Sequence, residues 1–166
     1  MSRYLLFAVV ASVATLISGE LALSLPLAGI GPDLIILVVV AFAIGERPRT
    51  AATAGFGAGL LRDLLLTTPT GLSAFAYAAT AYGAALIGVP RGVGPVVGMF
   101  AAATFVSQLI YGLGAVFLGP QVDPSPLPRM LMVTTAYNAL ISPLLMPVLR
   151  RVVRADGGIP TADIQR

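Results

Sequence analysis

The fold of this chain is decided by residues 55–88, GFGAGLLRDLLLTTPTGLSAFAYAATAYGAALIG, an apolar stretch interrupted by a TTPTG turn. The pattern predicts two helices joined by that turn. The stretch also carries Arg62 next to Asp63 in its otherwise apolar first half. Charged side chains inside a membrane are rare and usually face the interior of a helix bundle. We therefore expect at least Asp63 to lie against protein.

The composition of the whole chain is that of an integral membrane protein. Of the 166 residues, 57% are hydrophobic and 10% are charged, whereas soluble domains have about 25% charged residues. Because the deficit of charge extends along the whole chain, the prediction is an all-α integral membrane protein rather than a soluble fold with one anchor.

The apolar runs predict about six transmembrane helices, at residues 4–25, 32–45, 50–66, 71–89, 94–118 and 128–149. A helix crosses roughly 30 Å of hydrocarbon with about 20 residues, so the short second and third runs fit if they are tilted or covered by neighbours. The first run is expected to be a retained helix rather than a cleaved signal peptide. We expect one six-helix domain over residues 1–150 and a short polar cytoplasmic tail over residues 151–166.

The arginines predict the orientation, since cytoplasmic loops of membrane proteins are rich in basic residues. In the six-helix arrangement one side of the membrane would hold Arg3, Arg47, Arg49, Arg91, Arg150, Arg151, Arg154 and Arg166, and the other side only Arg129. Both termini are therefore expected on the cytoplasmic side of the membrane. The arginines of the tail are placed to meet anionic lipid headgroups.

Small residues repeat every fourth position in the third run, at Ala51, Gly55 and Gly59, and Asp63 continues the series. Glycines at this spacing let a neighbouring helix approach closely, so Asp63 should face that neighbour. We expect its carboxylate to accept hydrogen bonds from the following turn, from Thr67, Thr68 or Ser73. Arg62, about 100° away around the helix, is expected to extend outwards towards the membrane surface.

Other residues are expected to be mainly structural. Gly94 and Gly98 repeat the small-residue spacing in the fifth run, and Asp33 follows Pro32 at a position typical of a helix cap. In the last run Tyr137 and Asn138 precede Pro143. Proline leaves the carbonyl of Ala139 without its helical donor, which predicts a kink and a local hydroxyl or amide partner such as Ser142 or Asn138.

The sequence offers little for catalysis. Without histidine it lacks the HExxH motif of metalloproteases and the usual base of serine hydrolases. Without cysteine it has neither a thiolate nucleophile nor iron–sulfur ligands. An aspartyl dyad of Asp33 and Asp63 is disfavoured, because Asp33 opens its helix outside the centre of the membrane and neither acid has the flanking GxGD sequence. We expect no enzymatic activity, no metal, no cofactor and no nucleic-acid partner.

Three blocks together resemble the family of rod-shape-determining MreD proteins. They are PDLIILVVVAF (32–42), GFGAGLLRDLLLTTPTGLSAFAYAATAY (55–82) and AYNALISPLLMPVLRRVV (136–153). The most specific parts are Gly59 to Leu65, the turn from Pro69 to Leu72, and the Tyr137–Asn138 pair that leads to Pro143. Thr70 stands where the family commonly has leucine.

This resemblance implies a non-catalytic scaffold in the inner membrane that supports cell shape and lateral peptidoglycan synthesis. Its partners would be the single-pass protein MreC, the MreB cytoskeleton and wall synthases. It also implies a bundle similar to the S-components of energy-coupling-factor vitamin transporters. Two alternatives stay open: an S-component that binds a vitamin between Asp63, Tyr77, Gln108 and Asn138, and a small scaffold with an unrelated partner.

Overall fold

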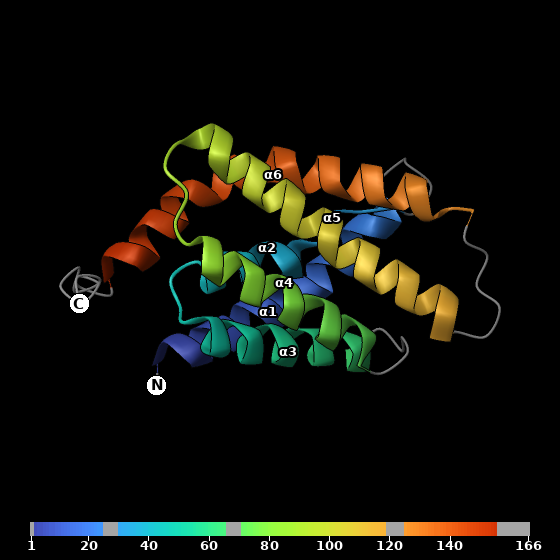
Figure 1. Ribbon diagram of the computed structural model, residues 1–166, viewed down its shortest axis with the longest axis horizontal. Coiled ribbons are helices and arrows are strands. Elements are labelled where there is room, and N and C mark those ends of the chain that lie inside the picture. Colours follow the sequence, from blue (N-terminus) through green and yellow to red (C-terminus); the bar gives the residue numbers. More distant parts are fainter. Residues whose placement is uncertain (1, 25–29, 66–70, 119–124, 156–166) are drawn as a thin grey trace.

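The structure is a computed structural model that describes residues 2–24, 30–65, 71–118 and 125–155. These residues form six helices and no strand (Figure 1). The helices are α1 (Ser2–Ser24), α2 (Leu34–Ala43), α3 (Pro48–Leu65), α4 (Leu72–Ile87), α5 (Val93–Leu118) and α6 (Leu127–Ala155). The all-α prediction is thus confirmed for the described residues, and most helix ends lie within two residues of the predicted ones. The last helix runs on to Ala155, past the start of the predicted tail.

One helical segment of the described part, Val93–Phe117 in α5, is long and apolar enough to cross a membrane. Three further apolar segments are shorter: Phe7–Ser18, Leu34–Ala43 and Leu72–Ile87. The expectation of about six crossings therefore stays a prediction. The predicted resemblance to the fold of S-components also remains a prediction.

The short helix α2 lies at the centre of the bundle and contacts each of the other five helices (Figure 1). A helix that is apolar all round is expected to be buried, and Ile35, Ile36 and Val40 are almost completely covered. With 10 residues, α2 is about 15 Å long, roughly half the thickness of the hydrocarbon core. The chain that leads into it is not helical, yet Ile30, Pro32 and Asp33 are buried. Irregular backbone at membrane depth requires such cover by protein.

Helices α3 and α4 form the hairpin that the opening stretch predicts. A Cβ atom built on Gly55 would lie 2.6 Å from the carbonyl oxygen of Tyr77, and one on Gly59 would lie 2.5 Å from Cα of Ala74. Only glycine permits this approach, so the prediction of a close helix neighbour is confirmed here. The neighbour is α4 of the same chain.

The proline in α6 is accommodated as the sequence predicts. The hydroxyl of Ser142 donates to the carbonyl oxygen of Ala139 at 2.8 Å, the group that Pro143 leaves without a backbone donor. Figure 1 shows that α6 changes direction in its second half. The bend agrees with the expected kink.

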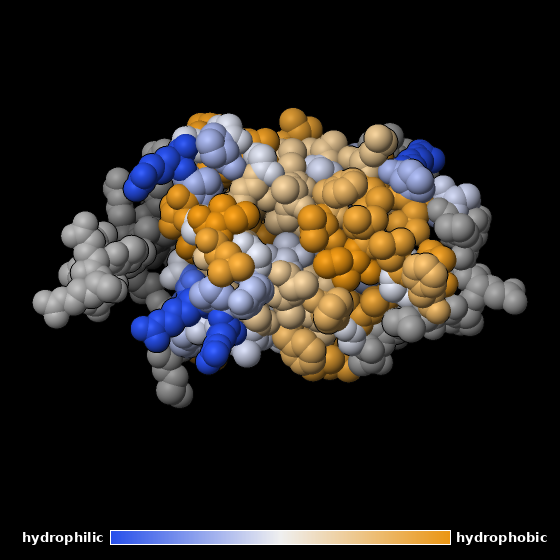
Figure 2. Space-filling view, in the orientation of Figure 1, coloured by the Kyte–Doolittle hydropathy of each residue, from blue (hydrophilic) through white to orange (hydrophobic). Residues whose placement is uncertain are grey.

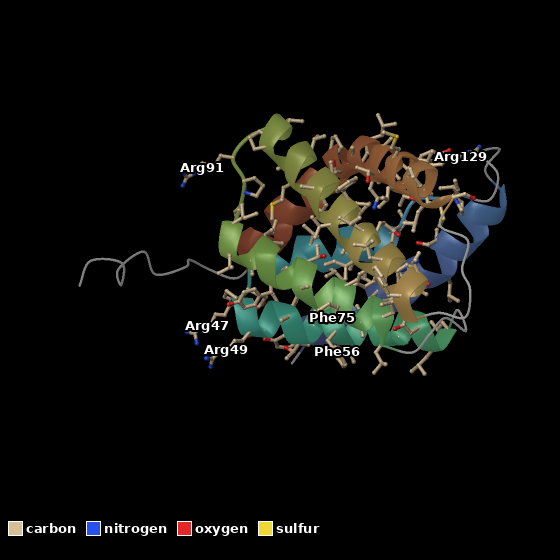
Figure 3. All side chains as sticks on the ribbon, turned by 45° about the vertical axis from the view of Figure 1, so that its right-hand side comes forward. Arg47, Arg49, Phe56, Phe75, Arg91 and Arg129 are labelled. Carbon is tan, nitrogen blue, oxygen red and sulfur yellow. The ribbon has the colours of Figure 1, made fainter. Side chains whose placement is uncertain are left out.

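The outer surface of the bundle is mainly apolar. Exposed side chains on α3 and α4 include Phe56 and Phe75, which point away from the bundle (Figure 3). Hydrophobic residues cover the middle of the face shown in Figure 2, and the most hydrophilic ones gather towards its two ends. This is the distribution of a surface that meets acyl chains in the middle and water at both ends.

Candidate functional site

Asp33 is the centre of a buried polar cluster. It is the N-cap of α2 and accepts a hydrogen bond from the backbone N–H of Ile36 at 3.3 Å, so the expected capping role is confirmed. The hydroxyl of Tyr77 in α4 lies 2.8 and 2.7 Å from the two carboxylate oxygens. The side-chain amide of Gln108 in α5 donates to Oδ2 at 3.1 Å. One carboxylate therefore joins the start of α2 to two other helices.

Arg62 brings α3 into the same cluster. Its Nη1 lies 3.6 Å from Oδ2 of Asp33 and 3.5 Å from the hydroxyl of Ser73. The guanidinium lies between two rings, with 5.6 Å to the centroid of Tyr77 and 5.4 Å to that of Tyr111. Its side chain is 19% exposed.

The prediction that Arg62 extends outwards is therefore wrong. The sequence places Arg62 on a different side of α3 from Asp63, but it does not reveal what lies opposite. Across the bundle Arg62 meets a carboxylate and two aromatic faces, which attract a guanidinium. Turning Arg62 outwards would leave Asp33 buried without a cation, which is costly.

Asn138 extends the cluster to α6. Its Nδ2 donates to the backbone carbonyl of Asp33 and to the hydroxyl of Thr104, both at 3.0 Å. The hydroxyl of Thr134, one turn away on α6, donates to the carbonyl of Gly31 at 3.3 Å. Together these bonds satisfy carbonyl groups of the non-helical segment before α2, as buried backbone requires. Tyr137, next to Asn138, is half-buried and takes no part in them.

Asp63 makes a second, separate joint at the turn between α3 and α4. Its Oδ2 accepts hydrogen bonds from the backbone N–H groups of Gly71 at 2.8 Å and Ala74 at 3.4 Å. Gly71 has a φ of 99°, a conformation that glycine adopts without strain. The expected contact with the following turn is present, but these donors are backbone amides. The Ser73 hydroxyl binds Arg62 instead, and Thr67 and Thr68 lie outside the described residues.

The glycines of α5 behave differently from those of α3. A Cβ built on Gly94 or Gly98 meets nothing within 4 Å, and both residues are exposed. Within the described part of the chain no other helix packs closely against Gly94 or Gly98. Among the described residues, therefore, no helix contact matches the one predicted for these two glycines.

The structure gathers residues that the sequence separates. Tyr77, Gln108 and Asn138, three of the four residues that a vitamin pocket would use, all contact Asp33. The sequence alone predicts only a capping role for Asp33. The signal that could have found its wider role is an acid at the start of an entirely apolar helix, which needs several donors once that helix is buried.

The contacts of the cluster run between helices. Both oxygens of Asp33 are engaged by protein donors. Among the described residues no three acidic side chains come close enough to hold a metal ion. Buried polar groups that satisfy one another fix the relative positions of the elements that carry them.

Comparison with known proteins identifies the family. The sequence model described as "rod shape-determining protein MreD" matches residues 1–155. The chain belongs to the MreD family. MreD proteins are membrane proteins of the machinery that determines rod shape, and the family is not known for enzymatic activity. No curated protein and no solved structure matches this MreD chain.

Proposed function

We propose that this MreD chain is a non-catalytic scaffold of the cell-elongation complex in the bacterial inner membrane. In this role it binds MreC through packing of transmembrane helices, and it supports lateral peptidoglycan synthesis together with MreB and wall synthases. About six crossings would place both termini in the cytoplasm. The observation that carries the proposal is the cluster around Asp33, whose hydrogen bonds and ion pair join α2 to α3, α4, α5 and α6.

The helix packing limits where a single-pass partner can bind. Gly55 and Gly59, which were candidates for such a contact, are covered by α4. A partner helix must therefore approach another face of the bundle. The two candidate glycines that stay open are Gly94 and Gly98 on α5.

The proposal is tested by purifying the tagged chain from solubilised membranes and measuring how much MreC accompanies it. We expect MreC to co-purify and depletion of the chain to convert rods to round cells. Absence of MreC together with unchanged rod shape would contradict the proposal. Gly98→Leu then tests the α5 face, because a Cβ atom added at Gly98 meets no atom of the described residues within 4 Å; a folded variant that loses MreC would support a contact at this face.

The alternative role, vitamin binding as in an S-component, has weaker support. Tyr77, Gln108 and Asn138 do meet in one place, as a pocket would require. However, the donors of these three side chains are already engaged by Asp33 and Thr104. A small molecule that remains bound through purification would favour this alternative.

A further inference from the structure

Three exposed arginines lie at one end of the bundle. Arg47 belongs to the turn between α2 and α3, Arg49 to the first turn of α3, and Arg91 to the loop between α4 and α5. Their side chains leave the bundle at the same end, and Arg129 lies at the opposite end (Figure 3). We call the three residues the arginine end.

The arginine end carries a net positive charge, because its three arginines outnumber the neighbouring acid, Glu46. Glu46, beside Arg47, is half-buried. Cations gathered at one end sum to a positive potential that attracts anions.

The surroundings of these arginines favour a lipid surface over a soluble acidic protein. Arg91 is preceded by Ile87, 74% exposed, and followed by Val93, 56% exposed. The backbone between them turns at Gly88 and Gly92, both with positive φ. A soluble partner that bound Arg91 would leave these apolar side chains in water, whereas a bilayer covers them and offers its headgroups to the arginine.

The length of the hairpin agrees with this placement. Helices α3 and α4 have 18 and 16 residues, which corresponds to about 27 and 24 Å. These lengths approach the roughly 30 Å of the hydrocarbon core. With the hairpin in the bilayer, the arginine end therefore reaches the level of the lipid phosphates.

We propose that the arginine end binds anionic phospholipid headgroups, so that this face selects phosphatidylglycerol-type lipids over zwitterionic ones. The phosphate and its net negative charge are the recognised groups. A basic residue near a charged membrane surface changes lipid binding by up to about fivefold. The three arginines should contribute together to the preference for anionic lipid, whereas Arg129 at the opposite end has no neighbouring arginine among the described residues to add to its effect.

The test uses the full chain in vesicles of phosphatidylcholine and phosphatidylglycerol. Spin-labelled lipids of each kind report the relative association constant at the protein surface. We expect the unsubstituted chain to prefer phosphatidylglycerol severalfold at low salt, and less at 0.5 M salt because screening is stronger. Substituting all three with glutamine (R47Q/R49Q/R91Q) should lower the preference by about threefold or more.

The matched control removes one arginine charge at either end of the bundle, at Arg91 or at Arg129. Arg91→Gln should reduce the preference about twofold, whereas Arg129→Gln should leave it nearly unchanged; far-UV circular dichroism checks that each variant is folded. Equal effects of these two substitutions, or an unchanged preference in the triple variant, would overturn the proposal. A triple variant that keeps its lipid preference but loses a co-purifying protein would assign the arginines to a protein contact, and would also overturn it.

Discussion

Replacing Gly59 by alanine should destabilise the bundle, although alanine favours helix formation. The new Cβ would lie 2.5 Å from Cα of Ala74 and from the carbonyl carbon of Ser73, about 0.9 Å short of the 3.4 Å at which ordinary contact begins. Both opposing atoms are backbone, so no side chain can rotate away. Helices α3 and α4 must separate locally instead.

The cost of this separation can be worked from the structure. Overpacking a tight interior costs about 1 to 3 kcal/mol. Moving the helices apart by nearly 1 Å would also weaken the 2.8 Å bond from Gly71 to Asp63. The gain in helix propensity offsets about 1 kcal/mol at most. We therefore expect a net loss of about 2 kcal/mol in the free energy of unfolding.

The matched control is Gly98→Ala, where the added methyl group meets nothing within 4 Å. Here only the helix propensity acts, so this variant should be as stable as the unsubstituted chain or more stable by up to about 1 kcal/mol. The assay is unfolding of the purified chain in detergent by titration with sodium dodecyl sulfate, followed by far-UV circular dichroism. Equal stability of the two variants would refute the close approach of α3 and α4.

Three further predictions concern polar groups. Tyr77→Phe removes the hydroxyl that binds Asp33 and should lower the free energy of unfolding by about 1 to 2 kcal/mol in the same titration. This value lies between the roughly 1.5 to 3 kcal/mol of hydrogen bonds to charged groups and the roughly 0.6 kcal/mol average of hydrogen bonds between membrane helices. An unchanged midpoint of the titration would show that the bond is weak. Asp63→Asn keeps one acceptor but loses the charge at the start of α4, and should cost about 1 kcal/mol, measured by thermal unfolding; stability equal to that of the original chain would remove the proposed joint. Ser142→Ala leaves the carbonyl of Ala139 without its donor and should lower the free energy of unfolding by about 1 kcal/mol, and a stabilised variant would speak against that bond.

Local features of the fold could be predicted from the sequence because their causes are local. Apolar runs of limited length fix where helices begin and end. The spacing of Gly55, Gly59 and Asp63 fixes which face of α3 meets a neighbouring helix. The turn directly after α3 brings α4 back against that face. Pro143 and Ser142 are one residue apart, so their compensation is also visible in the sequence.

The cluster around Asp33 could not be predicted in this way. Its partners Tyr77 and Gln108 lie 44 and 75 residues along the chain, and no periodicity links them. Their meeting depends on α2 taking the centre of the bundle, which follows from the packing of all six helices together. The inward direction of Arg62 has the same origin, since it is set by what α2, α4 and α5 place opposite.

The measurement that tests the central claim most directly is a double-mutant cycle between Asp33 and Arg62. We expect Asp33→Asn and Arg62→Gln each to lower the free energy of unfolding by about 2 kcal/mol or more, because each leaves a largely buried charge without its partner. The double variant leaves neither charge, so its loss should fall short of the sum by at least about 1 kcal/mol. Strictly additive losses would contradict the claim that this pair holds the bundle together.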